Sequence, residues 1–188
     1  MKNVVFLDNH DMSRIYSIVG ENFNKDKMAF AWLLTTRGIP EMYYGDEILM
    51  KNFKNPDGLV REDFPGGWPG DRINKFTSPQ RTDSENIFFN YVRALANYRK
   101  QSNALRFGKL MQYVPENNNY VYFRYDKNNT VMIIMNMNNT AQQINTKRFY
   151  QRMNGFTKAK NIITGNEINN IEKIVVPPES ALVLELER

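Results

Sequence analysis

Cysteine is absent from this sequence of 188 residues, and histidine occurs once, at position 10. The chain therefore forms no disulfide and has no thiol chemistry, and a single histidine argues against a zinc site. No hydrophobic run is long enough to cross a membrane, and we expect no signal peptide. The net charge is +5, but the basic residues are scattered and do not form the stripe typical of proteins that bind nucleic acid.

The sequence does contain two short apolar segments that each end in acidic residues. Residues 4–7 (VVFL) lead into DNHD at 8–11, and residues 39–44 (IPEMYY) lead into GDE at 45–47. Such runs are typical of buried parallel strands, and active sites of parallel α/β folds lie where these strands end. The alternative is that the acids only cap a following helix. The pattern alone does not separate the two interpretations.

Helical periodicity follows each of these segments. We expect one helix over residues 25–37, with Asn24 as its N-cap and Gly38 as its termination signal, and another from residue 83 or 84 to 102. Residues 50–80 are too rich in proline and glycine in places for regular structure. We therefore expect a long loop there, and long loops are usually functional or packed excursions.

From residue 107 onward the pattern changes to short alternating segments separated by turn signals. Their spacing predicts an antiparallel β-sandwich, with a helical turn within residues 147–154. We expect this part to pack structurally, or else to bind carbohydrate through exposed aromatic side chains. The expected strands are residues 109–114, 120–125, 131–136, 142–145, 160–163, 171–176 and 181–186.

The part before residue 106 is incomplete as a fold. Two parallel strands cannot close a barrel, which needs eight. The first strand is also too apolar to be a protected edge. We therefore expect the chain to be the C-terminal portion of a longer protein, with an α/β piece over residues 1–105 and an all-β domain over 106–188.

Three motifs carry a resemblance to a known family. FLDNHD at residues 6–11, followed by Arg14, resembles the fourth conserved region of the α-amylase family of glycoside hydrolases (family 13). GIPEMYYGDEI at 38–48 resembles the segment at that family's last barrel strand. REDFPGGWPGD at 61–71 resembles the neopullulanase and cyclomaltodextrinase branch, in particular starch-utilisation enzymes of Bacteroides-like bacteria.

This resemblance implies a fold class of α/β plus β. The first part would be the remnant of a (β/α)₈ TIM barrel, with strand seven at residues 2–7, strand eight at 39–45 and the eighth helix at 84–102. A C-terminal antiparallel β-sandwich would follow at 106–188. Family members carry a nucleophilic aspartate on strand four and a glutamate acid/base on strand five, and this sequence contains neither.

The resemblance assigns Asp11 as the third carboxylate of the site, a transition-state stabiliser. It would accept hydrogen bonds from sugar hydroxyls and favour the oxocarbenium-like charge of retaining hydrolysis. His10 would bind a hydroxyl of the same glucose, the alternative being a buried structural histidine. Asn9 is expected to bond the local backbone, and Asp8 has a structural alternative.

Arg14 and Trp68 complete the predicted substrate-binding set. Arg14 would orient the site carboxylates, or else form a surface ion pair. Trp68 would stack on a glucose ring at the edge of the cleft, or else pin its own loop.

For Asp46 and Glu47 we favour structural roles, in helix capping and a salt bridge, over contact with substrate. Arg61 and Asp63 could form contacts at the rim of the site, and the sequence does not decide whether they do.

The implied function is that of an α-glucan hydrolase acting on α-1,4 linkages in starch, pullulan or cyclodextrins. Its partners would be α-glucan oligosaccharides, and the chain alone would be inactive. The resemblance gives this chain no cofactor or metal, leaves calcium open for the full-length protein, and implies a periplasmic location for it. We also expect self-association through the truncated barrel edge. The alternative is a non-catalytic carbohydrate-binding or structural module.

Overall fold

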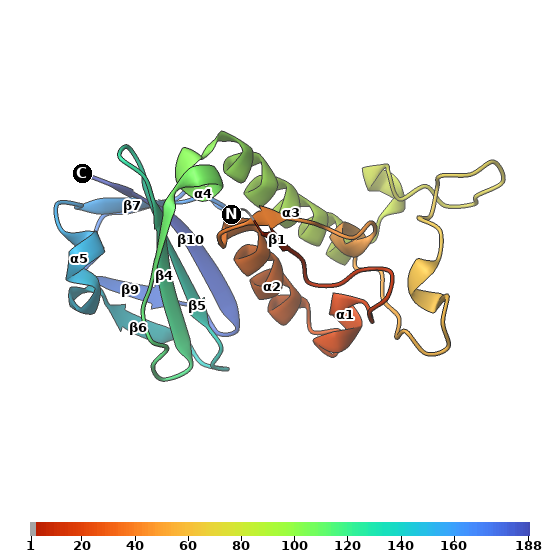
Figure 1. Ribbon diagram of the computed structural model, residues 1–188, viewed down its shortest axis with the longest axis horizontal. Helices are drawn as coiled ribbons and strands as arrows, with labels where there is room; N and C mark the ends of the chain where they lie inside the picture. Colours follow the sequence, from red (N-terminus) through yellow and green to blue (C-terminus); the bar gives the residue numbers. More distant parts are fainter. Residues whose placement is uncertain (1–2) are drawn as a thin grey trace.

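The computed structural model describes residues 3–188 and shows a helical half joined to a β-rich half (Figure 1). The helical half contains a small parallel sheet in which β1 (Val4–Val5) pairs with β2 (Ile39–Pro40). Both strands arise from the two apolar segments, but they are shorter than expected. Lys2, within the first predicted strand, lies outside the described residues.

Helices pack beside this sheet, and their ends correct the sequence-based boundaries. The predicted N-cap at Asn24 is wrong, because the Asn22 side chain accepts hydrogen bonds from the backbone N–H groups of Asn24 and Lys25, each at 3.0 Å. No helix within residues 3–188 is long and apolar enough to cross a membrane. The helices of this half are α1 (Ile15–Ile18), α2 (Phe23–Thr35), α3 (Asp83–Gln101) and the unpredicted α4 (Asn103–Phe107).

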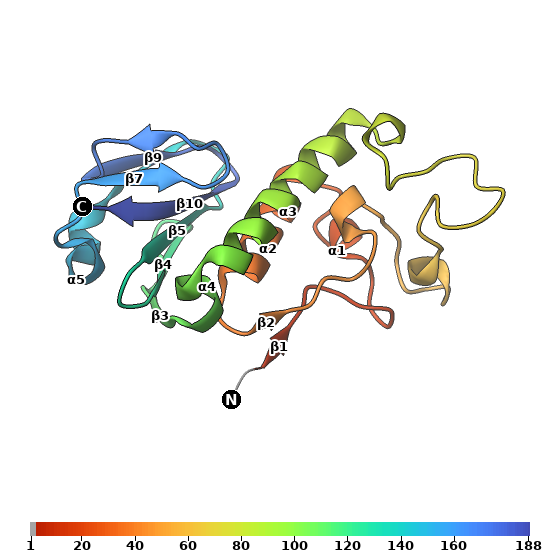
Figure 2. The ribbon, with the colours of Figure 1, turned by 90° about the horizontal axis from the view of Figure 1, so that it is seen from above.

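The long loop predicted between α2 and α3 is confirmed. It follows the 3₁₀ turn η1 (Asp46–Ile48) and is interrupted only briefly, by η2 (Leu59–Arg61) and η3 (Ser78–Gln80). Figures 1 and 2 show the loop extending away from the β-rich half.

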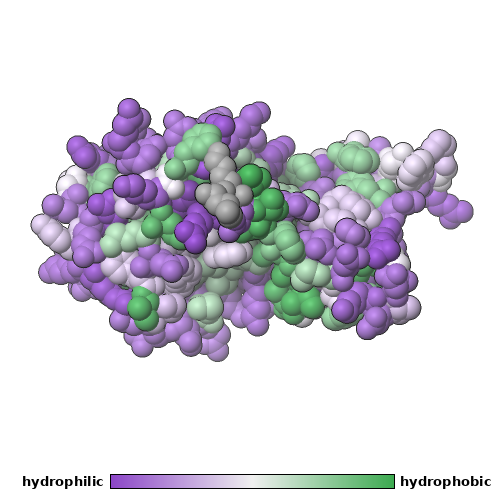
Figure 3. Space-filling model, viewed as in Figure 1, coloured by the Kyte–Doolittle hydropathy of each residue, from purple (hydrophilic) through white to green (hydrophobic). Residues whose placement is uncertain are grey.

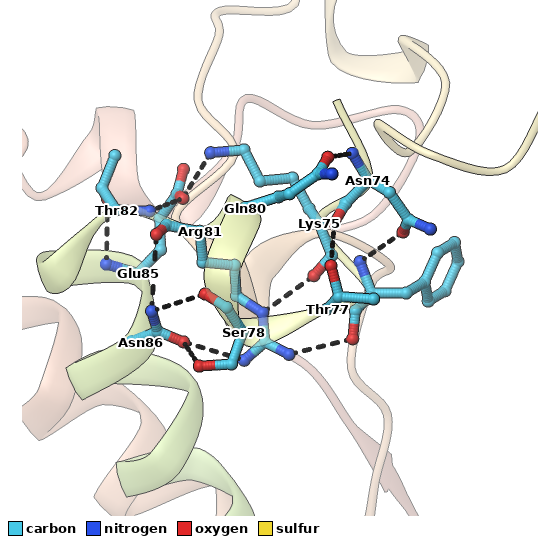
Figure 4. A network of polar contacts seen from close by, with 10 residues as sticks. Asn74, Lys75, Thr77, Ser78, Gln80, Arg81, Thr82, Glu85 and Asn86 are labelled. Atoms are coloured by element: carbon cyan, nitrogen blue, oxygen red, sulfur yellow. Dashed lines mark hydrogen bonds and ion pairs between the residues drawn. The ribbon is translucent and has the colours of Figure 1, made fainter. Parts of the chain in front are cut away.

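The end of this loop is fastened to the start of α3 by the polar network in Figure 4. Thr82 caps α3, one residue before the predicted position, and Glu85 completes a capping box by accepting a hydrogen bond from the Thr82 N–H at 2.8 Å. Arg81 Nε donates to the Lys75 carbonyl at 2.8 Å. The Lys75 ammonium in turn pairs with Glu85. This network fixes where the loop re-enters the helical half.

The β-rich half confirms the antiparallel prediction. Among the described residues its main sheet has the order β3-β4-β5-β10-β7-β8, and β6 pairs with β9 in a second sheet. The expected helical turn is present as η4 (Thr146–Phe149) and α5 (Tyr150–Met153). The two-residue strand β8 was not predicted. The strands are β3 (Lys109–Gln112), β4 (Asn119–Tyr125), β5 (Thr130–Asn136), β6 (Gln142–Asn145), β7 (Lys158–Asn161), β8 (Glu167–Ile168), β9 (Lys173–Val176) and β10 (Ser180–Glu187).

The main sheet is buried on both faces, which explains why β5 is apolar at nearly every position. Successive side chains of a strand point to opposite faces. On β5, Val131 and Ile133 join the core formed with the helices, whereas Met132 and Ile134 join the core beneath the second sheet. The sheet thus links the two cores of the molecule.

Two buried arginines join the helical half to this sheet at the C-terminal end of α2. Arg99 of α3 donates to the carbonyls of Leu34 (3.0 Å) and Thr36 (3.2 Å). Arg124 of β4 donates to the carbonyls of Thr35 (2.9 Å) and Thr36 (2.5 Å). The last carbonyls of a helix lack partners within the helix, and a cation is favourable there. These guanidinium groups therefore satisfy the buried C-terminal end of α2.

We predict that Arg124→Met destabilises the chain by about 2–5 kcal/mol, because buried carbonyls lose their hydrogen-bond donors. Urea unfolding followed by circular dichroism measures this free energy. Arg93→Gln, at an exposed position of α3, serves as the control and should change it by less than about 0.5 kcal/mol. Equal stability of Arg124→Met and the unmodified chain would contradict this role.

Candidate functional site

The turn after β1 is held by two side-chain hydrogen bonds to the backbone. Asp8 is buried, and its Oδ2 accepts from the N–H of Ile15, the first residue of α1, at 2.5 Å. Asn9 Oδ1 accepts from the N–H of Asp11 at 2.9 Å, which confirms the local role expected for Asn9. For Asp8 the structural alternative holds. With both hydrogen bonds in place, the turn directs His10 and Asp11 toward the surface.

His10 and Asp11 lie together on the surface. The imidazole Nε2 is 3.3 Å from Asp11 Oδ2, and the side chains are 63% and 68% exposed. The alternative of a buried structural histidine is therefore wrong. A carboxylate and an imidazole with this exposure offer both an acceptor and a donor for the hydroxyl groups of a ligand.

Arg61 completes this surface group, at the rim position that the sequence left undecided. Its Nη2 lies 3.1 Å from Asp11 Oδ1, and its Nε donates to the His10 carbonyl at 2.9 Å. The same Nη2 lies 3.5 Å from Asp57 Oδ1. Arg61 thus ties the long loop to the turn after β1. No local pattern relates two residues fifty positions apart, so the sequence offered no signal for this pair.

Arg14 lies below the surface group and requires a correction. Its side chain is 1% exposed, with Nη1 donating to the Tyr44 carbonyl (2.5 Å) and to Asp46 Oδ1 (3.1 Å). The guanidinium carbon lies 4.0 Å from the centre of the Tyr43 ring. The alternative of a surface ion pair is therefore wrong, because the ion pair is buried, and Arg14 has almost no exposed surface to offer a sugar. The structural role expected for Asp46 is confirmed by the same ion pair.

Asp8 and Asp46 share this interior with a third carboxylate, Asp26 of α2. Asp26 is fully buried, and neither of its oxygens accepts a hydrogen bond. Burial and, to a smaller extent, the charge of Asp8 raise the pKa of Asp26 to about 7. Burial and Asp8 also raise the pKa of Asp46, while Arg14 opposes the rise. No group of three or more acidic or histidine side chains in the described part of the chain has the arrangement of a metal site.

Trp68 lies out on the long loop with 63% of its surface exposed. The interpretation that it pins the loop is wrong, because Asp71 does so. Asp71 Oδ2 accepts hydrogen bonds from the backbone N–H groups of Gly66 (2.8 Å) and Trp68 (3.0 Å). The indole is therefore left accessible, and its predicted contact with substrate stays a prediction.

The sequence matches a known protein family and several known proteins. Residues 110–185 match the family described as the cyclo-malto-dextrinase C-terminal domain. An α-amylase of Niallia circulans is 33% identical over 73% of this chain and 23% of its own length. A cyclomaltodextrinase of Geobacillus thermopakistaniensis is 33% identical over 73% of this chain and 21% of its own. The chain belongs to the α-amylase family of glycoside hydrolases.

Within the α-amylase family, this chain matches only part of each relative. Alpha-amylase 3 of Dictyoglomus thermophilum aligns with 98% of the chain at 26% identity, but over 38% of its own length. The crystal structure of an α-amylase from Geobacillus thermoleovorans, complexed with acarbose, has a TM-score of 0.75 and covers 98% of this chain and 39% of its own. At 23% identity that likeness shows a shared fold. The narrower Bacteroides-like branch stays a prediction.

Asp26 makes the stability of this α-amylase-family chain depend on pH. Its pKa rises on folding from 3.8 to about 7, so between these values the folded state binds more protons than the unfolded state. Stability should therefore fall as the pH rises through this window. We predict that the Asp26→Asn variant does not lose stability as the pH rises through this window. At pH 8 its free energy of unfolding should exceed that of the unmodified chain by about 2–4 kcal/mol.

Urea unfolding of the chain and the variant at pH 5 and pH 8 measures this difference. Asp83→Asn, an exposed aspartate at the start of α3, is the matched control and should leave the pH dependence unchanged. An Asp26→Asn variant with the same pH dependence as the unmodified chain would show that Asp26 does not titrate in this window.

Proposed function

We propose that this chain is the C-terminal part of a retaining α-glucan hydrolase that cuts α-1,4-glucosidic bonds in starch-derived glucans. The observation that carries the proposal is the exposed His10–Asp11 pair, which follows a parallel strand and is tied to the long loop by Arg61. Curated relatives named α-amylase and cyclomaltodextrinase support it.

We propose further that β1 and β2 are the last two strands of a (β/α)₈ barrel. They are parallel neighbours, as consecutive barrel strands are. Val4, Phe6 and Ile39 expose 51%, 43% and 48% of their surface, and Figure 3 shows hydrophobic side chains gathered near this segment while the β-rich end is mostly hydrophilic. Other barrel strands would cover this face. Without them we expect the chain to associate with itself there.

The division of the chain follows from the same proposal. Residues 1–105 would belong to the barrel and residues 106–188 to a C-terminal domain that packs on its last helices. The junction at Arg99 and Arg124 would then be the contact between catalytic and C-terminal domains.

Retaining hydrolysis uses two carboxyl groups about 5–5.5 Å apart, one as nucleophile and one as acid/base. Asp11 would be neither of these. Arg61 holds its Oδ1, so the carboxylate is oriented before substrate arrives, and its charge favours the positive transition state. His10 would donate to a hydroxyl of the same sugar. The bond-breaking pair would come from chain outside this sequence.

Arg14 and Trp68, the other two predicted site residues, would have different roles. Arg14 would act as a positioning residue, because its buried bonds to Asp46 and the Tyr44 carbonyl connect the two strand ends. Trp68 would offer its exposed indole to a sugar ring farther along the cleft.

We predict that the 188-residue chain alone hydrolyses no pullulan, cyclodextrin or maltooligosaccharide, because it supplies only one of the three carboxylates. A reducing-sugar assay on the purified chain, with a heat-inactivated sample as control, measures this. Release of reducing ends above that control would overturn the assignment of the missing pair.

In the full-length protein, Asp11→Asn should lower turnover by about 10²–10³-fold or more while sugar binding largely survives, because the lost charge acts mainly in the transition state. Steady-state kinetics and calorimetry with maltoheptaose separate the two effects. Asp83→Asn, at an exposed aspartate at the start of α3 and outside the site, is the control. Turnover within twofold of the unmodified enzyme would exclude Asp11 from the site.

A further inference from the structure

A cavity of about 1030 Å³ lies at the junction between the helical and β-rich halves. Figure 2 shows α4, β2 and β3 meeting in this region, away from the long loop that carries Arg61. The volume is at the upper end of the range of small-molecule sites, which often lie between domains. The cavity is lined by four arginines and by no acidic residue: Arg37, Arg99, Arg106 and Arg124.

The four arginines divide into an inner and an outer pair. Arg99 and Arg124 are buried and hold the C-terminal end of α2. The Nε of Arg124 is also buried and has no hydrogen-bond acceptor. Arg37 and Arg106 are exposed, so their guanidinium groups can turn toward a ligand without unfolding the junction.

No carboxylate in residues 3–188 forms an ion pair with any of these arginines. Burial and the charge of Arg106 lower the pKa of Arg99, and burial and Arg99 lower that of Arg124 to about 10. Arg99 is therefore repelled by Arg106, and Arg124 by Arg99. An anion bound there would offset this repulsion.

The rest of the lining indicates what kind of anion fits. Guanidinium groups match the oxygens of phosphate in a bidentate way. Trp32 and Val5 add apolar side chains to the same cavity, which suits a ligand with an organic body. We propose that this cavity binds a phosphate dianion, either free or as a small monoester. Arg37 and Arg106 would bind the phosphate directly, and the positive charges of Arg99 and Arg124 would attract it.

Calorimetry on the 188-residue chain tests this, with inorganic phosphate in one arm and glucose 6-phosphate in the other, at constant ionic strength set with sodium chloride. We expect saturable binding with one site per chain. Tighter binding of the ester identifies a monoester as ligand, and equal binding identifies free phosphate. Each of these results supports the site, whereas heats that do not saturate would overturn it.

The double variant Arg37→Gln/Arg106→Gln should weaken binding at least tenfold. Both residues are exposed, and unchanged circular dichroism checks that the fold is kept. The matched control is Arg72→Gln/Arg93→Gln, which removes two exposed arginines outside the cavity and should leave the affinity within twofold. An equal loss in both double variants would show that only net charge attracts phosphate and would overturn the site.

Discussion

The hydrogen bonds that Arg99 and Arg124 donate to the last carbonyls of α2 are the constraint on which the rest of the structure depends. This helix lies between α3 and the main β-sheet, so its last residues are buried. Unsatisfied buried carbonyls are costly. Arg99 from α3 and Arg124 from β4 supply the donors, and each comes from a different packing partner of α2. The interaction that completes the helix is therefore also the one that joins the two halves.

The same contact determines where the candidate site lies. Arg99 Nη2 donates to the Gly38 carbonyl at 2.6 Å, immediately before β2. Gly38 has a φ of +114°, and a Cβ there would lie 2.8 Å from the Asn3 carbonyl oxygen, so only glycine lets the two strands pair this closely. At the other end of the strands, Arg14 and Asp46 link the turns that follow them. The turn carrying Asp11 is thus fixed at both ends of the small sheet.

The sequence predicts what depends on near neighbours and fails where partners are distant. Short apolar segments bounded by turn signals identify β5 and the other long strands, and Asn9 bonds a residue two positions away. For Arg14 the sequence leaves a surface ion pair open beside a role in orienting the site carboxylates, because charged side chains are usually exposed. Its partner Asp46 is thirty-two residues away, and burial of the pair becomes visible only when both strand ends meet. The sequence left the rim position of Arg61 undecided for the same reason, because its partner Asp11 is fifty residues away.

Charge is arranged along α2 in a way that connects the site to the junction. Asp26 lies in the first turn of the helix and the guanidinium groups of Arg99 and Arg124 lie at its last, so both ends complement the helix dipole. At the N-terminal end this favours the charge on Asp26, but burial and Asp8 act against it and prevail. The interior beneath His10 and Asp11 therefore holds a carboxyl group that gains its charge near neutral pH. Asp8 repels that charge and also accepts the hydrogen bond from the Ile15 N–H at the start of α1, so one carboxylate contributes both to the interior electrostatics and to holding the turn that presents Asp11.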